Sequence, residues 1–160
     1  METKPVKRDE NILKLSRDHH FGLLFCWKIR QGLKNGASPA RIVAYIRHFW
    51  EKHLREHFEE EETILFTPRK DILVEKALDD HRDIRLHIES LAADAKHGEL
   101  DLLADKVDKH IRFEERQLFP HLEKILSKEQ LKDIGERLGK NQTPLKDEYA
   151  DEFWAIQDTK

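Results

Sequence analysis

The sequence predicts an all-α protein: an up-down-up-down antiparallel four-helix bundle followed by a short C-terminal helix and a tail. Apolar residues recur with helical spacing through long stretches rich in Leu, Ile, Glu, Lys and Arg. Only six Gly and five Pro interrupt these stretches, and no strand of consequence is indicated. Because short loops join the four long helices, antiparallel neighbours are the expected packing.

The first two helices have clear boundary signals. We expect the first helix over about residues 11–33, where Asn35-Gly36 supplies the stop. The second opens at Ser38-Pro39, a cap followed by a proline in the first turn, and it ends at Thr67-Pro68. Both segments carry an apolar stripe that faces the core of the bundle.

The next two helices complete the predicted bundle. The third is expected from about Asp71 to Lys96, before His97-Gly98 breaks the pattern. The fourth covers about residues 99–126. Pro120 lies late within it and predicts a kink or a local break.

The C-terminal region is predicted to cover the bundle. Ser127 and Gln130 form a capping-box pattern that starts a fifth helix to about residue 140. The tail over residues 141–160 is polar except for an aromatic cluster, and we expect that cluster to dock on the bundle: Tyr149, Phe153 and Trp154.

Length and composition predict a single domain over residues 1–160, with the bundle over about 11–126 and the C-terminal helix and tail over 127–160. Charged residues make up 38% of the chain and the net charge is −3, so no basic field for nucleic acid stands out. We recognise neither a secretory signal nor the apolar run of about 20 residues that spans a bilayer. The single Cys26 excludes an internal disulfide framework. We therefore expect a cytoplasmic protein with no nucleic-acid or membrane partner.

One sequence pattern occurs twice. His57 precedes Glu61 by four residues, and His110 precedes Glu114 by four, each within a segment of helical periodicity. Residues four apart lie on one face of a helix, and imidazole with carboxylate is a ligand set for iron, manganese or zinc. The repeat predicts two metal ions, or one site built from two halves.

Two further histidines lie at the same level of the predicted bundle. Counting a rise of about 1.5 Å per residue from the loops brings His81 level with His57 and with the second repeat, and His19 close to that level. Carboxylates on apolar faces are costly to bury, so the two glutamates need cations or protons nearby. Taken singly, each histidine is explained by an ordinary hydrogen-bonded imidazole, but the coincidence across four helices favours a metal site.

Direction on the helix separates the remaining candidates. His19 and His20 point about 100° apart, so only one faces the core, and His19 is preferred because it lines up with apolar neighbours. His53 is interpreted as structural, with a ligand or supporting role as the alternative. We expect Glu59–Glu62 to be a solvated face from which only Glu61 points inward. The other histidines are predicted at the surface or in loops: His48, His87, His97 and His121.

These residues, in this order, resemble the hemerythrin-like, or HHE cation-binding, domain family. Its H…HxxxE…H…HxxxE arrangement is matched by His19 or His20, His57 with Glu61, His81, and His110 with Glu114. The Glu-Glu-x-x-Leu-Phe segments at residues 61–66 and 114–119 match as well, and the resemblance covers about residues 11–126. It implies two iron ions in an oxo- or hydroxo-bridged diiron centre, with both glutamates bridging and the histidines terminal. Zinc or manganese are the substitutes.

One position departs from the oxygen-carrying hemerythrins, which have a second histidine one turn after the first on the third helix. Here that position is Arg85. The chain therefore resembles the four-His, two-Glu bacterial and regulatory members, which implies redox reaction with oxygen, peroxide or nitric oxide more than reversible oxygen transport. Arg85 is interpreted as a solvated residue, with a supporting contact to Glu62 as the alternative.

Other classes of metal protein fit less well. Ferritin-like diiron oxidases place Glu three residues before His, where this chain has Leu54, Leu78 and Val107, and the HExxH motif of zinc hydrolases is absent. We expect a diiron protein that binds, senses or detoxifies O2, NO or peroxide, or handles iron, and that is more a binding protein than a dedicated enzyme. The alternative is a regulatory or interaction bundle with a structural or vestigial metal site, whose protein partner the sequence does not identify.

Overall fold

The computed structural model describes residues 7–139 and 148–156, and in these ranges every regular element is helical. The α-helices are α1 (Leu13–Lys34), α2 (Pro39–Phe49), α3 (Arg55–Glu60), α4 (Ile72–Ser90), α5 (His97–Phe113), α6 (Phe119–Ile125) and α7 (Lys128–Gly139). Three π-helical turns interrupt them: η1 (Trp50–Leu54), η2 (Glu61–Leu65) and η3 (Glu114–Leu118). The predicted all-α class is confirmed.

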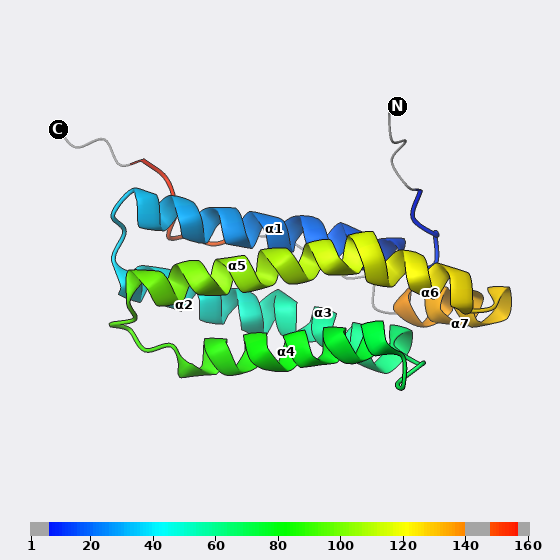
Figure 1. Ribbon diagram of the computed structural model, residues 1–160. Helices are drawn as coiled ribbons and strands as arrows, with labels where there is room; N and C mark the ends of the chain where they lie inside the picture. The colour runs from blue at the N-terminus through cyan, green and yellow to red at the C-terminus, as the bar shows by residue number, and fades with distance from the viewer. Residues whose placement is uncertain (1–6, 140–147, 157–160) are drawn as a thin grey trace, which may run out of the picture.

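Four long helical segments make up the bundle. They are α1, the run from α2 to η2, α4, and the run from α5 to α6, and they lie alongside one another in Figure 1. α5 packs against α1, α2 and α4, while α7 contacts η2 at one end. A site between the four segments is therefore enclosed on all sides by helix.

Side-chain caps fix two of the helix starts. The Asp71 carboxylate accepts hydrogen bonds from the backbone N–H groups of Leu73 and Val74, which satisfies donors that have no partner within α4. Ser127 and Gln130 exchange hydrogen bonds of 2.8 and 3.1 Å. The predicted capping box before α7 is confirmed.

The loop between α4 and α5 differs from the prediction. α4 ends at Ser90 rather than near Lys96, because Leu91 adopts an extended conformation and is buried in the core. His97-Gly98 does not break a helix but begins α5, where the first N–H groups have no intrahelical acceptor in any case. Pro120 lies in the first turn of α6, directly after η3, and the helical path continues through it.

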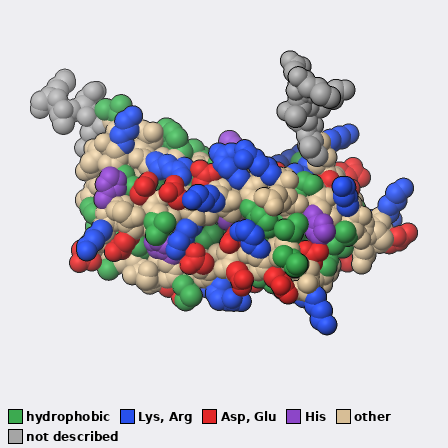
Figure 2. Space-filling model, in the orientation of Figure 1, with side chains coloured by type: hydrophobic (Ala, Val, Ile, Leu, Met, Phe, Trp, Pro, Cys, Tyr) green, Lys and Arg blue, Asp and Glu red, His purple; other side chains and the backbone are tan. Residues whose placement is uncertain are grey.

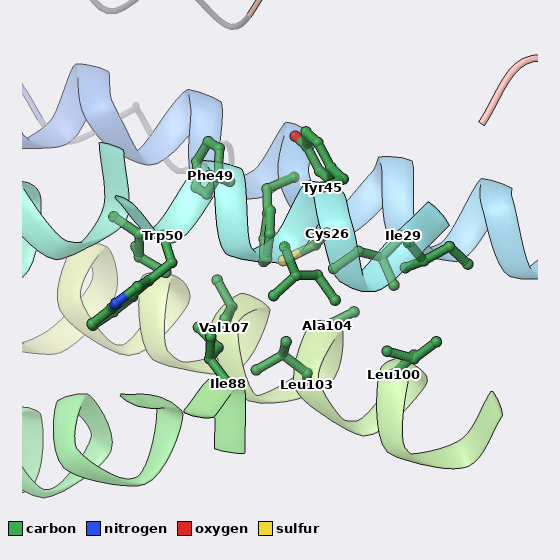
Figure 3. Packing of buried hydrophobic residues seen from close by; sticks show 14 of the residues in the cluster. Cys26, Ile29, Tyr45, Phe49, Trp50, Ile88, Leu100, Leu103, Ala104 and Val107 are labelled. Carbon is green, nitrogen blue, oxygen red and sulfur yellow. The ribbon is translucent and has the colours of Figure 1, made fainter. Parts of the chain in front are cut away.

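Buried apolar side chains form two clusters, separated by a polar layer. The larger cluster contains Phe49 and Val107, and Figure 3 shows its packing. The smaller cluster contains Leu15 and Phe119. Along α1, the buried His19 follows Leu15 of the smaller cluster and precedes Phe25 of the larger one. The histidines and glutamates thus cross the core as a single layer.

The described part of the C-terminal tail packs on the larger cluster. Phe153 is buried there, with Tyr149 and Trp154 against it. A Cβ at Gly32 would lie 2.6 Å from the Phe153 ring, so the glycine makes room for that side chain. The fifth predicted helix corresponds to α7, which is described to Gly139. Residues 1–6, 140–147 and 157–160 lie outside the described residues.

The surface carries both signs of charge, and Lys and Arg side chains alternate with Asp and Glu over the face seen in Figure 2. None of the described helices is both long enough and apolar enough to cross a bilayer.

Candidate metal centre

Six polar side chains converge in the layer between the two apolar clusters, and none is more than 6% exposed. They are His19 from α1, His57 from α3, Glu61 from η2, His81 from α4, His110 from α5 and Glu114 from η3. They form two groups of four that share both glutamates, and the potential ligand atoms within each group lie within 4.8 Å of one another. The first group holds His19 and His57, and the second holds His81 and His110.

All four imidazoles turn the same nitrogen inward. The Nε2 atoms of His57 and His81 lie 3.3 and 3.1 Å from Glu61 Oε1. Those of His19 and His110 lie 2.9 and 3.3 Å from Glu114 Oε1. The donor set is therefore four imidazole nitrogens around two carboxylates.

These residues fit a pair of metal ions. Among the described residues, the Nε2 atoms of His57, His81 and His110 are buried without a hydrogen-bond partner. Both Glu61 carboxylate oxygens and Glu114 Oε2 are likewise buried and unpaired. Buried polar atoms are normally satisfied, and imidazole with carboxylate suits iron, manganese or zinc. Cations between the two glutamates would satisfy these atoms together.

Both glutamates lie where the helix changes type. Glu61 is the first residue of η2 and Glu114 is the first residue of η3, and the backbone N–H of Phe66 donates to the Glu61 carbonyl five residues earlier. Single π-helical turns inside α-helices are frequent at functional sites. These turns were not predicted, because one wide turn shifts the phase of the apolar pattern by a single residue, a shift that is hard to recognise within a long helix.

Every inward-facing histidine also has an outer partner, because its Nδ1 donates to a carboxylate. The four pairs are His19 with Glu115 (2.8 Å), His57 with Asp18 (3.1 Å), His81 with Glu62 (2.8 Å) and His110 with Asp80 (3.0 Å). Asp18, Asp80 and Glu115 were not predicted as part of the site. A signal was present, since each of the four acids is adjacent in sequence to one of the six central residues.

The carboxylates hold protons on the imidazoles of the metal-free protein. Burial by itself would lower the pKa of His19, but hydrogen bonds to Glu114 and Glu115 outweigh it and raise the pKa to about 9. Burial is likewise outweighed at His57, where the Glu61 charge and the Asp18 hydrogen bond raise the pKa to about 10. A metal ion that binds here would displace protons.

The other predicted candidates lie outside this layer. His20 is exposed and belongs to neither group, whereas His19 belongs to the first. Arg85 lies at the surface, 3.9 Å from Glu62 Oε2, so the contact considered as the alternative exists as a long ion pair. The prediction that only Glu61 turns inward from the acidic run is wrong for Glu60. That residue is 4% exposed and lies 2.5 Å from Lys14 Nζ.

A small cavity of about 20 Å³ adjoins the centre. It is bordered by His19, His57, His110 and Glu114, and otherwise mainly by apolar side chains. His53, which is half-buried, also contributes to its wall. This volume holds about one molecule of the size of water.

Comparison with known proteins agrees with this arrangement. The sequence model of the hemerythrin HHE cation-binding domain matches residues 11–122. The chain belongs to this family. No curated protein and no solved structure matches the chain. The match spans the whole layer of histidines and glutamates. Cation binding by this hemerythrin-like chain is therefore supported both by its family and by its buried donor set.

Proposed function

We propose that this hemerythrin-like chain is a non-haem diiron protein. One observation carries the proposal: two buried groups of four donors share the carboxylates of Glu61 and Glu114. The ligands would be His19, His57, Glu61, His81, His110 and Glu114. Zinc and manganese accept the same donors and are the alternative occupants. A single cytoplasmic domain with helices in up-down-up-down order is part of the same proposal.

The partner of this centre would be a small molecule: O2, NO or peroxide. Bound iron supplies redox chemistry toward such molecules. The chain itself contributes the six donors, apolar walls that limit access by water, and a cavity with room for one small molecule beside His19 and His57. Binding, sensing or detoxification of that molecule, or the handling of iron, would follow from this arrangement.

The competing hypothesis is a regulatory bundle whose metal is only structural and whose C-terminal aromatic residues bind a partner. The packing of those residues supports it poorly. Phe153 is buried in the chain's own core, and the ring of Trp154 covers Lys28, with 4.1 Å between Nζ and the ring centroid.

The test is the metal content and the visible spectrum of the protein purified in air. Wild type should contain about two irons per chain and show the absorption of an oxo-bridged diferric pair. A Glu61→Ala/Glu114→Ala variant should lose both, because each carboxylate belongs to both groups. The matched control is Glu56→Ala/Glu59→Ala, at two exposed positions of α3, which leads into η2. A folded wild-type protein without affinity for iron would contradict the proposal. Mixing the reduced protein separately with O2, NO and peroxide then identifies the reactive partner.

A further inference from the structure

The four outer hydrogen bonds connect the helical segments in a closed ring. Each carboxylate neighbours one central residue in sequence but bonds to a histidine of another segment. Asp18 on α1 bonds to His57 on α3, Glu62 on η2 to His81 on α4, Asp80 on α4 to His110 on α5, and Glu115 on η3 to His19 on α1. Because α3 continues into η2 and α5 continues into η3, the ring joins all four segments in chain order.

We propose that Asp18, Glu62, Asp80 and Glu115 are positioning residues, which hold the four imidazoles in their metal-binding orientation before any metal arrives. This inference rests on the proposed metal-binding function of the same centre. It adds four residues to the working site, none of which is a metal ligand.

The chemistry of imidazole explains the role. A histidine can present either ring nitrogen, and the hydrogen bond made by one nitrogen decides which one is left for a metal. In this chain Nδ1 is bonded outward in all four histidines, so Nε2 faces Glu61 and Glu114. A carboxylate acceptor also increases the basicity of the coordinating nitrogen.

Each outer carboxylate has a cation beside it as well. The pairs are Asp18 with Lys14 (3.5 Å), Glu62 with Arg85 (3.9 Å), Asp80 with Lys76 (3.0 Å) and Glu115 with Arg8 (3.7 Å). An ionised carboxylate can only accept hydrogen bonds, so each of the four bonds is donated by the imidazole N–H. The order of contacts is therefore the same four times: imidazole to carboxylate, and carboxylate to cation.

The test compares Asp80→Ala, Asp80→Asn and the control Asp79→Ala. Asp79 is the preceding residue and pairs with Arg82 at the surface, so its replacement removes the same charge without touching a histidine. Affinity for Zn2+ alone, measured by competition with a chelator, should fall about 10–100-fold in Asp80→Ala. Asp80→Asn keeps an acceptor oxygen and should recover part of this loss, while Asp79→Ala should bind like wild type.

A second measurement does not depend on metal binding. In the metal-free protein, the hydrogen-bonded Nδ1–H proton of His110 should give a downfield proton signal that Asp80→Ala abolishes and Asp79→Ala retains. The inference is overturned if Asp80→Ala keeps both this signal and the Zn2+ affinity. If wild type binds neither Zn2+ nor iron, the proposed function fails, and the proton signal still decides the orientation of the ring.

A second position protects the test against misfolding. If Asp80→Ala unfolds, Glu62→Ala removes the partner of His81 on a different helical segment, with Glu59→Ala as its exposed control. The same loss of Zn2+ affinity and of the His81 Nδ1–H signal is expected. Wild-type behaviour of Glu62→Ala would overturn the inference.

Discussion

The half of the candidate metal centre that contains His19 and His57 has the same inner donors as the half that contains His81 and His110. Both halves share the same two glutamates, and every histidine has an outer carboxylate. The surroundings of the two halves differ. The small cavity borders both histidines of the first half and only His110 of the second.

The outer cations of the two halves differ in exposure to solvent, and those of the first half are less exposed. Around the first half, the side chains of Arg8 and Lys14 are 9% and 25% exposed. Around the second half, those of Arg85 and Lys76 are 44% and 53% exposed. A repeated sequence pattern has therefore produced two similar sets of candidate ligands in unequal surroundings. The first is called the enclosed half here, because a cavity lies beside it and its outer cations are less exposed. The outer cations of the second half are more exposed, although its histidines are fully buried.

The largest expected effect comes from two single variants, each of which removes one histidine from one half. His57→Ala and His81→Ala each leave one complete group of four, so iron should fall from about two to about one per chain in both. In His57→Ala the remaining ion lies in the half whose outer cations are exposed, and a chelator should extract it faster than from His81→Ala. The exposed His97 supplies the control, His97→Ala. Equal extraction rates would show that the difference in enclosure has no consequence for the metal.

The pH dependence of stability tests whether His19 and His57, the histidines of the enclosed half, carry an additional proton in the metal-free protein. The pKa values of His19 and His57 in the metal-free protein are about 9 and about 10, against an ordinary value of 6.5. A raised histidine pKa contributes stability that is fully present below pH 6.5 and is lost as the pH rises through 9 and 10. The Tm of the metal-free protein should therefore fall across this window.

The metal-loaded protein is the control for that experiment, because its coordinating nitrogens carry no protons and its Tm should fall less. A His57→Gln variant of the metal-free protein should lose part of the slope. A flat Tm from pH 6 to pH 10 in the metal-free wild type would contradict the expected proton load.

The helices and the convergence of the inner histidines and glutamates could be predicted because they depend on periodicity. The offset of four residues between His57 and Glu61, and the apolar stripe around them, determine direction without any knowledge of neighbours. Leu91 shows where prediction from periodicity fails. The apolar spacing typical of a helix continues past this residue, but α4 ends there because the Leu91 side chain is buried in the core.

The outer shell could not be predicted in the same way, because it depends on which helices are adjacent. Asp18 resembles any exposed acid next to a histidine, and its bond to His57 exists only once α1 and α3 are packed. Glu60 was assigned to a solvated face for the same reason. Its burial depends on Lys14 of another helix.

Replacement of one lysine in each half should separate the two environments by stability. Lys14 neutralises the buried Glu60 and lies 3.5 Å from Asp18, so Lys14→Ala should lower the free energy of unfolding by about 2 kcal/mol. Lys76 is mostly exposed, and Lys76→Ala should cost less than about 1 kcal/mol. Urea unfolding measures both, with the exposed Lys52→Ala as control. Equal losses would mean that the enclosure of the first half does not strengthen its charge pairs.

The smallest expected effect concerns the cavity and is tested by Gly22→Ala. A Cβ at this position would lie 2.6 Å from Ile111 Cδ1, at the flexible end of a side chain that lines the cavity. The isoleucine must turn away from the new methyl group, and we expect it to narrow the space beside His19. Reaction of the reduced iron protein with NO, followed by stopped-flow absorbance, should slow about tenfold, which corresponds to about 1.4 kcal/mol.

Stability should fall by at most about 2 kcal/mol in Gly22→Ala, because two effects partly cancel. Tighter packing costs about 1–3 kcal/mol, while alanine gains about 1 kcal/mol over glycine within a helix. Gly98→Ala, where a Cβ meets nothing within 4 Å, is the control and should react like wild type. If Gly22→Ala keeps its iron and reacts with NO as fast as Gly98→Ala, NO does not reach the metal through this cavity. The reaction would then not take place in the half beside the cavity.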